Sequence, residues 1–311
     1  MEKEKREHKD RLFCFIFGSE EHKEWTLSLY NAVNGTNYMD PEMITIATLP
    51  QVLYMGMRDD VAVLALQMDM LDLYEHQASY NPNMPLRLMQ YTSNIYEMLI
   101  TLWDKNKYSS KLIKLPVPKL VVFYNGTTNQ PDEKMLYLTD AFSEDKQAES
   151  DIQVKVRMIN INRGHSPRLT EGCRPMKEYV WMIDRIREHE KNEPLAEAID
   201  RALKEMPEEF EIKRYLEANR EGVKKMLLTE YDEVKTMRQF KEEGREEGRE
   251  EGREEGITQE TLSGIKRAMR KQNMTLAAAM DYMDIPLKKQ SEYAAMLREE
   301  TVGNESYVTG Q

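Results

Sequence analysis

The chain has 311 residues, of which 32% are charged, and a formal net charge of -11. This length can bury a sizeable hydrophobic core, so we expect one domain of ordinary size with an appendage. The excess of acid disfavours a protein that holds nucleic acid by electrostatics alone, because such proteins usually present a basic surface. A local basic surface stays open as an alternative, through Arg87, Lys105, Lys107, Lys111, Lys114 and Lys119.

Cysteine usage and hydropathy indicate the compartment. Cys14 and Cys173 are the only cysteines and lie far apart in sequence, which predicts a reducing environment without a disulfide framework. Residues 1–10 are mostly charged and do not form a secretory signal. No apolar run approaches the roughly 20 residues of a membrane helix. We therefore expect a cytoplasmic protein with no membrane partner.

The first predicted elements are a helix and a β-hairpin. Residues 20–33 show helical spacing, and the Gly35 that follows is typical of a helix end. Residues 61–66 are apolar, and residues 68–75 alternate between apolar and polar as a half-buried strand does. If the two stretches pair with a turn near residues 67–70, Asp60 and Glu75 come close together.

This hairpin carries the candidate site. Two carboxylates at such a distance bind a hard divalent cation well. Gln77 shares the face of Glu75, whereas His76 points to the other face, because strand side chains alternate. Such a cluster, Asp60, Glu75 and Gln77 around a metal, is typical of phosphodiester cleavage. A solvated hairpin is the alternative, since acids are frequent in this chain.

Further elements indicate an α/β or α+β core. Pro85 is placed to start a helix, on which Arg87 and Tyr91 lie four residues apart and share one face. Residues 120–124 form a continuous apolar run, typical of a buried strand, and residues 154–161 read as another strand. Strands mixed with helices over residues 10–165 predict this class of core.

The second half of the chain is helical in character. We expect the core to span residues 10–170 and a helical extension packed on it to span residues 171–240. The EEGR repeat at 241–256 has no fixed apolar face and indicates a solvated, marginal helix or linker, or else an interaction tail. Residues 257–300 predict a small helical unit that resembles a helix-turn-helix, with dimerisation or packing as the plainer interpretation.

Several segments together resemble the Rpn family of recombination-promoting nucleases and transposases, of the PD-(D/E)XK type. The resemblance covers nearly the whole chain from about residue 10, and NPNMPLR and LTEYD are its most specific strings. The matching segments are residues 10–13, 15–17, 54–57, 60–61, 74–77, 81–87 with Tyr91, 122–126, 131–134, 160–165, 228–232 and the EEGR repeat.

The resemblance implies a restriction-endonuclease-like fold, a mixed central sheet flanked by helices. It implies a Mg²⁺-dependent DNA endonuclease in recombination or transposition, with Asp60 and Glu75 as metal ligands. Gln77 takes the place where most of the superfamily has lysine, and the backbone carbonyl of His76 completes the metal shell. Arg87 and Tyr91 contact the scissile phosphate, brace Glu75, or form a structural pair. Double-strand cleavage further suggests a homodimer, through the C-terminal helices.

Some residues depart from the family pattern. Asp59 and Ala62 replace residues expected in Asn-Asp-Val-Ser, and Cys14 stands where a basic residue is expected. Gln77 carries no charge, so it orients water or donates hydrogen bonds but cannot act as a cation. The alternative function is therefore an inactive descendant that binds DNA or a protein partner. A purely structural helical scaffold fits only the C-terminal half.

Overall fold

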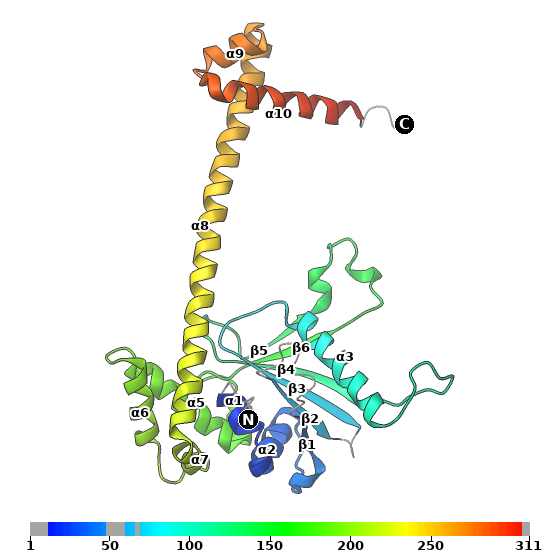
Figure 1. Cartoon of the computed structure of the whole chain (residues 1–311), viewed down its shortest axis with the longest axis vertical. Coiled ribbons are helices and arrows are strands. Elements are labelled where there is room, and N and C mark those ends of the chain that lie inside the picture. The colour runs from blue at the N-terminus through cyan, green and yellow to red at the C-terminus, as the bar shows by residue number, and fades with distance from the viewer. Residues whose placement is uncertain (1–11, 48–59, 66–68, 307–311) are drawn as a thin grey trace, which may run out of the picture. The chain divides into compact units, whose positions relative to one another are not determined.

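The protein, represented by a computed structural model, is described over residues 12–47, 60–65 and 69–306 (Figure 1). For some residues in these ranges, Asp60 among them, only the backbone is described. Contacts within the chain divide it into two compact units, Met1–Val234 and Lys235–Gln311. Within the described ranges, no helix is both long and apolar enough to cross a membrane.

A mixed sheet forms the centre of the first unit, and its six described strands run in the order β1-β2-β3-β4-β6-β5 (Figure 1). The strands are β1 Thr45–Ala47, β2 Asp60–Ala65, β3 Met70–Gln77, β4 Val117–Tyr124, β5 Glu133–Tyr137 and β6 Lys155–Asn160. The β3–β4 and β4–β6 pairs are parallel, and the other three pairs are antiparallel. The predicted mixed class of core, with strands and helices combined, is confirmed.

Helices cover both faces of this sheet. Leu71 and Leu73 of β3 pack into a cluster with α3, Met84–Leu102. Tyr74 lies on the other face and joins the larger core. The helices of that core include α1 Leu12–Phe17, α2 Lys23–Asn34 and α5 Arg174–His189. Because alternate side chains of a strand point to opposite faces, β3 is buried on both sides.

The ends of two helices agree with the sequence. Pro85 lies in the first turn of α3, where its missing N–H costs nothing. Gly35 ends α2 in the left-handed conformation, with φ of 68°, and its N–H donates to the carbonyl of Asn31. The helix expected from residue 20 begins three residues later, because Glu20–His22 forms a 3₁₀ turn instead.

The predicted helical extension packs on the same core. Its helices are α4 Pro167–Gly172, α5, α6 Leu195–Glu205, α7 Lys213–Ala218 and the first turns of α8, Arg220–Gln272. Val223 and Leu227 of α8 are fully buried in the core of the first unit. Residues 171–234 therefore share one hydrophobic core with the sheet.

The second unit holds the rest of α8 with α9 Leu276–Tyr282 and α10 Leu287–Ser306. Ile265 of α8, with Ala279 and Met280 of α9, forms its own small apolar cluster. The EEGR repeat lies inside α8, so the helical alternative is the one that the structure adopts. A Cβ at Gly248 or Gly252 would meet nothing within 4 Å, which shows that packing does not require these glycines.

Gly126, by contrast, is required by close packing after β4. A Cβ added there would contact the Tyr124 hydroxyl and lie 2.6 Å from the backbone oxygen of Ala78. Because backbone yields less easily than a flexible side chain, we expect Gly126→Ala to lower the free energy of unfolding by about 1–3 kcal/mol. Urea unfolding measures this loss, with Gly248→Ala as the control. An unchanged stability of Gly126→Ala would contradict the packing argument.

Candidate active site

The register of β2 and β3 brings the candidate site together. Asp60 pairs directly with Glu75 at the end of this antiparallel ladder, as the sequence predicts. Directly opposed positions belong to the same face of a sheet, with Cβ atoms about 5 Å apart. The side chain of Asp60 lies outside the described part of the structure, so its role as a metal ligand stays a prediction. The turn expected at residues 67–70 is described only from Asp69.

Glu75 is buried and held by two side chains. Its side chain is 3% exposed, and Arg87 Nη2 lies 2.9 Å from Glu75 Oε1. Gln77, two residues further along β3, donates from Nε2 to the same oxygen at 2.8 Å. The predicted sharing of one face by Glu75 and Gln77 is therefore confirmed. One carboxylate oxygen therefore lies within hydrogen-bond distance of both a guanidinium and an amide.

Helix α3 supplies the second layer of the site. Arg87 donates from Nη2 to the Tyr91 hydroxyl at 3.1 Å, and its guanidinium lies 5.8 Å from the centre of the Tyr91 ring. Met84 Sδ lies 2.8 Å from Gln77 Nε2, so the amide is fixed between a carboxylate and a thioether. Among the alternatives for Arg87 and Tyr91, this geometry favours bracing of Glu75.

His76 faces the opposite side of the sheet. Its Nε2 is 3.0 Å from the hydroxyl of Tyr179, and its ring stacks on Phe13 with centroids 5.4 Å apart. Its Nδ1 lies 3.4 Å from a carboxylate oxygen of Glu230, on α8. As strand alternation predicts, the imidazole points away from Glu75 and into the core. It links the strand of the candidate site to the beginning of α8.

Asp72 is a second buried acid of β3 that the sequence reasoning missed. It is fully buried, accepts a hydrogen bond from Asn34 Nδ2 at 2.9 Å, and lies 3.3 Å from the Tyr74 hydroxyl. Burial raises the pKa of Asp72, although the bonds from Asn34 and Tyr74 and the charge of Lys119 oppose this rise. An acid between Leu71 and Leu73 in a buried strand is the signal that could have found it.

Asp72 makes stability depend on pH. Since its pKa is raised in the folded protein, the folded form binds the proton more tightly, and stability falls as the pH rises through that pKa. Asp72→Asn keeps an acceptor for Asn34 but cannot ionise. We expect the variant to lose less stability than the wild type as the pH rises from 3.8, the ordinary carboxyl value, through the raised pKa of Asp72.

Thermal unfolding across this pH range measures the effect of Asp72. Asp69→Asn serves as the control, because Asp69 is exposed in the turn before β3. Parallel pH profiles of the wild type and Asp72→Asn would contradict the raised pKa of Asp72.

The donors at the hairpin fit a hard divalent cation. Mg²⁺ is typically held by one or two carboxylates and keeps several waters, so Asp60 and Glu75 with an amide at Gln77 supply a suitable set. The described residues contain no group of three or more His, Cys, Asp or Glu side chains that could hold a metal. A cation at this place therefore depends on the carboxylate pair, and Arg87 must share Glu75 with it.

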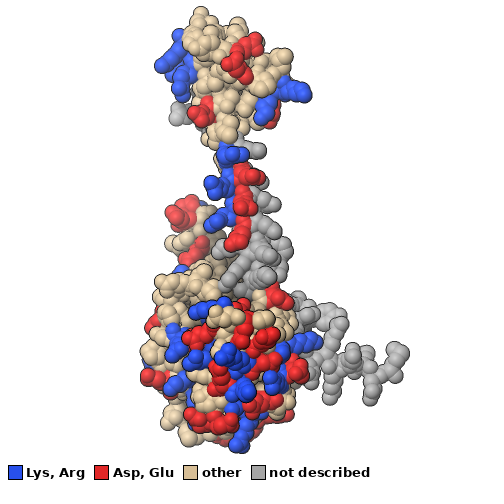
Figure 2. Space-filling model, turned by 90° about the vertical axis from the view of Figure 1, so that its left-hand side faces the viewer, with Lys and Arg blue, Asp and Glu red and all other residues tan. Residues whose placement is uncertain are grey.

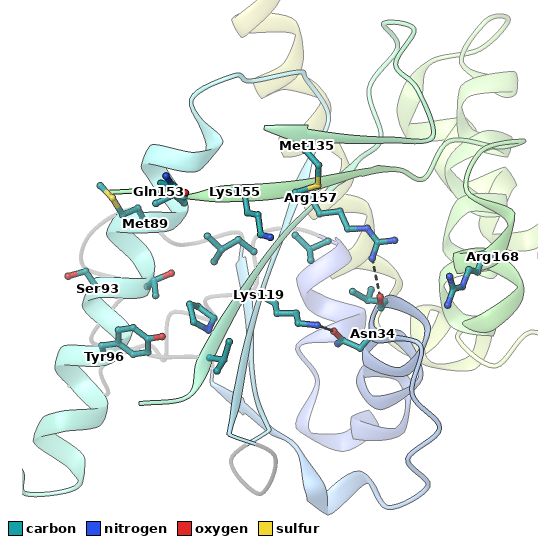
Figure 3. A pocket seen from close by; sticks show the side chains of 17 residues that line it. Asn34, Met89, Ser93, Tyr96, Lys119, Met135, Gln153, Lys155, Arg157 and Arg168 are labelled. Carbon is teal, nitrogen blue, oxygen red and sulfur yellow. Dashed lines mark hydrogen bonds between the residues drawn. The ribbon is translucent and has the colours of Figure 1, made fainter. Parts of the chain in front are cut away.

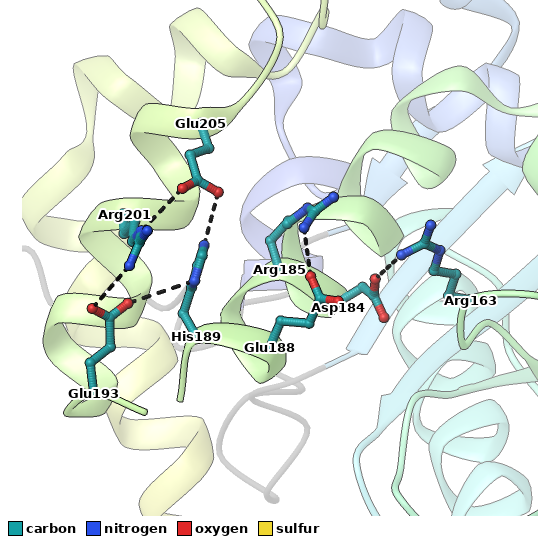
Figure 4. A network of polar contacts seen from close by, with 8 residues as sticks. All are labelled: Arg163, Asp184, Arg185, Glu188, His189, Glu193, Arg201 and Glu205. Atoms are coloured by element: carbon teal, nitrogen blue, oxygen red, sulfur yellow. Dashed lines mark hydrogen bonds and ion pairs between the residues drawn. The ribbon is translucent and has the colours of Figure 1, made fainter. Parts of the chain in front are cut away.

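The charged surface of α5 and α6 is neutralised by pairing. His189 lies 2.8 Å from Glu205, and Arg201 lies 3.1 Å from the same carboxylate (Figure 4). Arg163 pairs with Asp184 nearby at 2.7 Å. Figure 2 shows one face of the first unit on which acidic and basic side chains are interspersed. Such a mixed surface gives no continuous basic track for a nucleic acid on this face.

Comparison with protein-family models, with curated proteins and with solved structures found no match to this chain. The geometry of the hairpin and the sequence resemblance are therefore the basis of any functional proposal. Within the described residues, both cysteines are buried and neither forms a disulfide. Burial raises the pKa of the Cys173 thiol to about 11, which argues against a thiolate nucleophile there.

Proposed function

We propose that the protein is a metal-dependent endonuclease that hydrolyses phosphodiester bonds in DNA. The observation that carries the proposal is the register that sets Asp60 opposite Glu75, with Gln77 hydrogen-bonded to Glu75 at 2.8 Å. This pair lies at the end of a strand in a mixed sheet covered by helices on both faces. The same residues carry the resemblance to the Rpn nucleases, so the strand register and the sequence pattern point to one site.

The restriction-endonuclease-like form of the core belongs to the proposal as well. In it, β2 and β3 form the hairpin that presents the acids, and the parallel β4 supports β3 along its whole length. Helix α3 closes the face on which Glu75 lies and contributes Arg87. The cytoplasm, a role in recombination or transposition, and a homodimer formed through the C-terminal helices complete the proposed account.

Each side chain then has a distinct task. Asp60 and Glu75 would hold Mg²⁺, which supplies an activated water and neutralises charge that develops on the phosphate. Gln77 orients a water or the Glu75 carboxylate through its amide, because it has no charge to offer. Arg87, 35% exposed at its side chain, is placed to hold Glu75 in the absence of DNA and to turn toward a phosphate.

The second candidate is an inactive descendant that binds DNA or a protein. The contact of 2.9 Å between Arg87 and Glu75 favours it, because a guanidinium on the carboxylate competes with a metal ion. The net charge of -11 disfavours DNA as a ligand of either candidate, so within this alternative it favours a protein partner. In this alternative the fold persists while Glu75 serves only as the partner of Arg87.

A cleavage assay distinguishes the two candidates. Supercoiled plasmid is incubated with purified protein in Mg²⁺ and, separately, in EDTA. The nuclease proposal predicts conversion to the open-circular or linear form in Mg²⁺ alone. An unchanged plasmid that nevertheless shifts in a gel-mobility assay would favour the binding descendant and overturn the nuclease.

A further inference from the structure

A cavity of about 940 Å³ opens in the first unit beside the beginning of β4 (Figure 3). β4 pairs with β6 only from Val121 to Tyr124, although it pairs with β3 from Val117 onward. The first residues of β4 therefore line an opening between β4 and β6. A volume of this size is typical of sites for small molecules.

The charge of the cavity is unlike that of the chain. Its lining includes Lys119, Lys155, Arg157 and Arg168, and no Asp or Glu is among the described residues that line it. The whole chain carries 55 acidic and 44 basic residues, so a lining with cations alone departs from its composition. Concave sites with one sign of charge concentrate the opposite ion. The cavity therefore favours an anion.

Three of these cations form no ion pair with an acid within the described residues. Arg157 already has protein partners, because it pairs with Glu133 at 2.5 Å and donates to the carbonyl of Val33. Lys119 donates to the neutral amide oxygen of Asn34 at 3.2 Å. Lys155 and Arg168 form no ion pair in the described part of the chain, and both side chains are labelled at the cavity in Figure 3. The arginines in Figure 4, by contrast, are all paired with acids.

The opposite wall of the cavity is apolar and comes from α3. Met89 and Tyr96 lie on one flank of the helix, and they are joined by Val117 and Leu120 of β4. The Tyr96 hydroxyl donates to the carbonyl of Pro116 at 2.7 Å, which fixes the ring. A thioether and an aromatic ring offer a surface suited to a flat, polarizable group.

This cavity is separate from the proposed active site. At about 100° per residue, Arg87 lies on nearly the opposite side of α3 from Tyr96. Glu75, Gln77 and Arg87 are not among the described residues that line the cavity. A ligand here would therefore bind whether or not the hairpin cleaves DNA.

We propose that the cavity binds a nucleoside phosphate, with the phosphate at Lys119 and Lys155, which lie on the neighbouring strands β4 and β6 (Figure 3), and the base against Met89 and Tyr96. Two positive charges that form no ion pair suit a phosphate dianion better than a single carboxylate, because each ammonium can donate to a different phosphate oxygen. The apolar wall adds affinity that inorganic phosphate alone cannot gain.

Isothermal titration of the full chain with adenosine 5′-monophosphate tests the proposal. Saturable binding is expected for the nucleotide, and weaker binding for adenosine or inorganic phosphate alone. Lys119→Ala and Lys155→Ala are each expected to weaken nucleotide binding about tenfold, since a hydrogen bond to a charged group is lost. Lys177→Ala is the matched control, because Lys177 is exposed on α5 and does not line the cavity.

Several results of these titrations would contradict the proposal. Equal affinity for inorganic phosphate and the nucleotide would overturn the base-binding part of the proposal. Absent saturation, or equal weakening by Lys177→Ala, would overturn the site. Circular dichroism of each variant confirms that it is folded before its affinity is compared.

Discussion

Glu75→Ala and Asp60→Ala are each expected to reduce Mg²⁺-dependent plasmid cleavage by at least about a hundredfold. Replacing even an outer partner of a metal ligand commonly costs 10–100-fold in affinity or activity, so the loss of a proposed ligand should reach or exceed this range. Either variant removes one of two carboxylates from opposed positions of the β2–β3 ladder. Rates of conversion of supercoiled plasmid measure the effect.

Asp59→Ala is the matched control for this prediction. It removes an acid of the same type from the neighbouring position in sequence and leaves the proposed ligands in place. Cleavage by Asp59→Ala should stay close to that of the wild type. If all three variants lost activity equally, or if Glu75→Ala retained it, the assignment of the site to this carboxylate pair would be wrong.

Phe13→Ala is expected to lower the free energy of unfolding by about 3–5 kcal/mol, the usual cost of emptying the space of a buried aromatic ring. Phe13 is fully buried on α1 and lies between the sheet and α5. Its ring centroid is 5.3 Å from that of Phe123, 5.4 Å from that of His76 and 6.2 Å from that of Tyr179. The substitution therefore opens a cavity among side chains of three elements.

Chemical denaturation of the wild-type protein and of Phe13→Ala measures this loss of unfolding free energy. Phe142→Ala provides the control, because Phe142 is 36% exposed and is expected to cost much less. A loss below about 1 kcal/mol for Phe13→Ala would show that α1 is not part of the core.

Local patterns predicted much of the fold. The apolar run at residues 120–124 predicted the buried part of β4, because a strand between two parallel neighbours exposes neither face to solvent. Gly35 predicted the end of α2, because the left-handed backbone there, with φ of 68°, favours glycine. The alternation of residues 68–75 placed Glu75 and Gln77 on one face and His76 on the other, as their contacts confirm.

Other elements had no local signal. α1 is buried on every side, so its apolar residues show no helical period that could distinguish a helix from a strand. β5 forms a sheet edge, and only Leu136 of its five residues is buried. Its alternation was too weak to stand out among polar neighbours.

The surroundings of the candidate site also required tertiary structure. The bond of Arg87 to Glu75 joins a helix to a strand, and spacing along α3 could show only that Arg87 and Tyr91 share a face. The basic cavity gathers Lys119, Lys155 and Arg168 from β4, β6 and α4, so no sequence window contains it. The six cations considered from sequence include only one of its members, Lys119.

Titration with Mn²⁺, followed by calorimetry or electron paramagnetic resonance, tests most directly whether the carboxylate pair holds a divalent metal. The account predicts saturable uptake by the wild type and by Asp59→Ala, and affinity at least about tenfold weaker for Glu75→Ala. Uptake that is absent in the wild type, or that is equal in Glu75→Ala, would contradict the proposed metal site at Asp60 and Glu75.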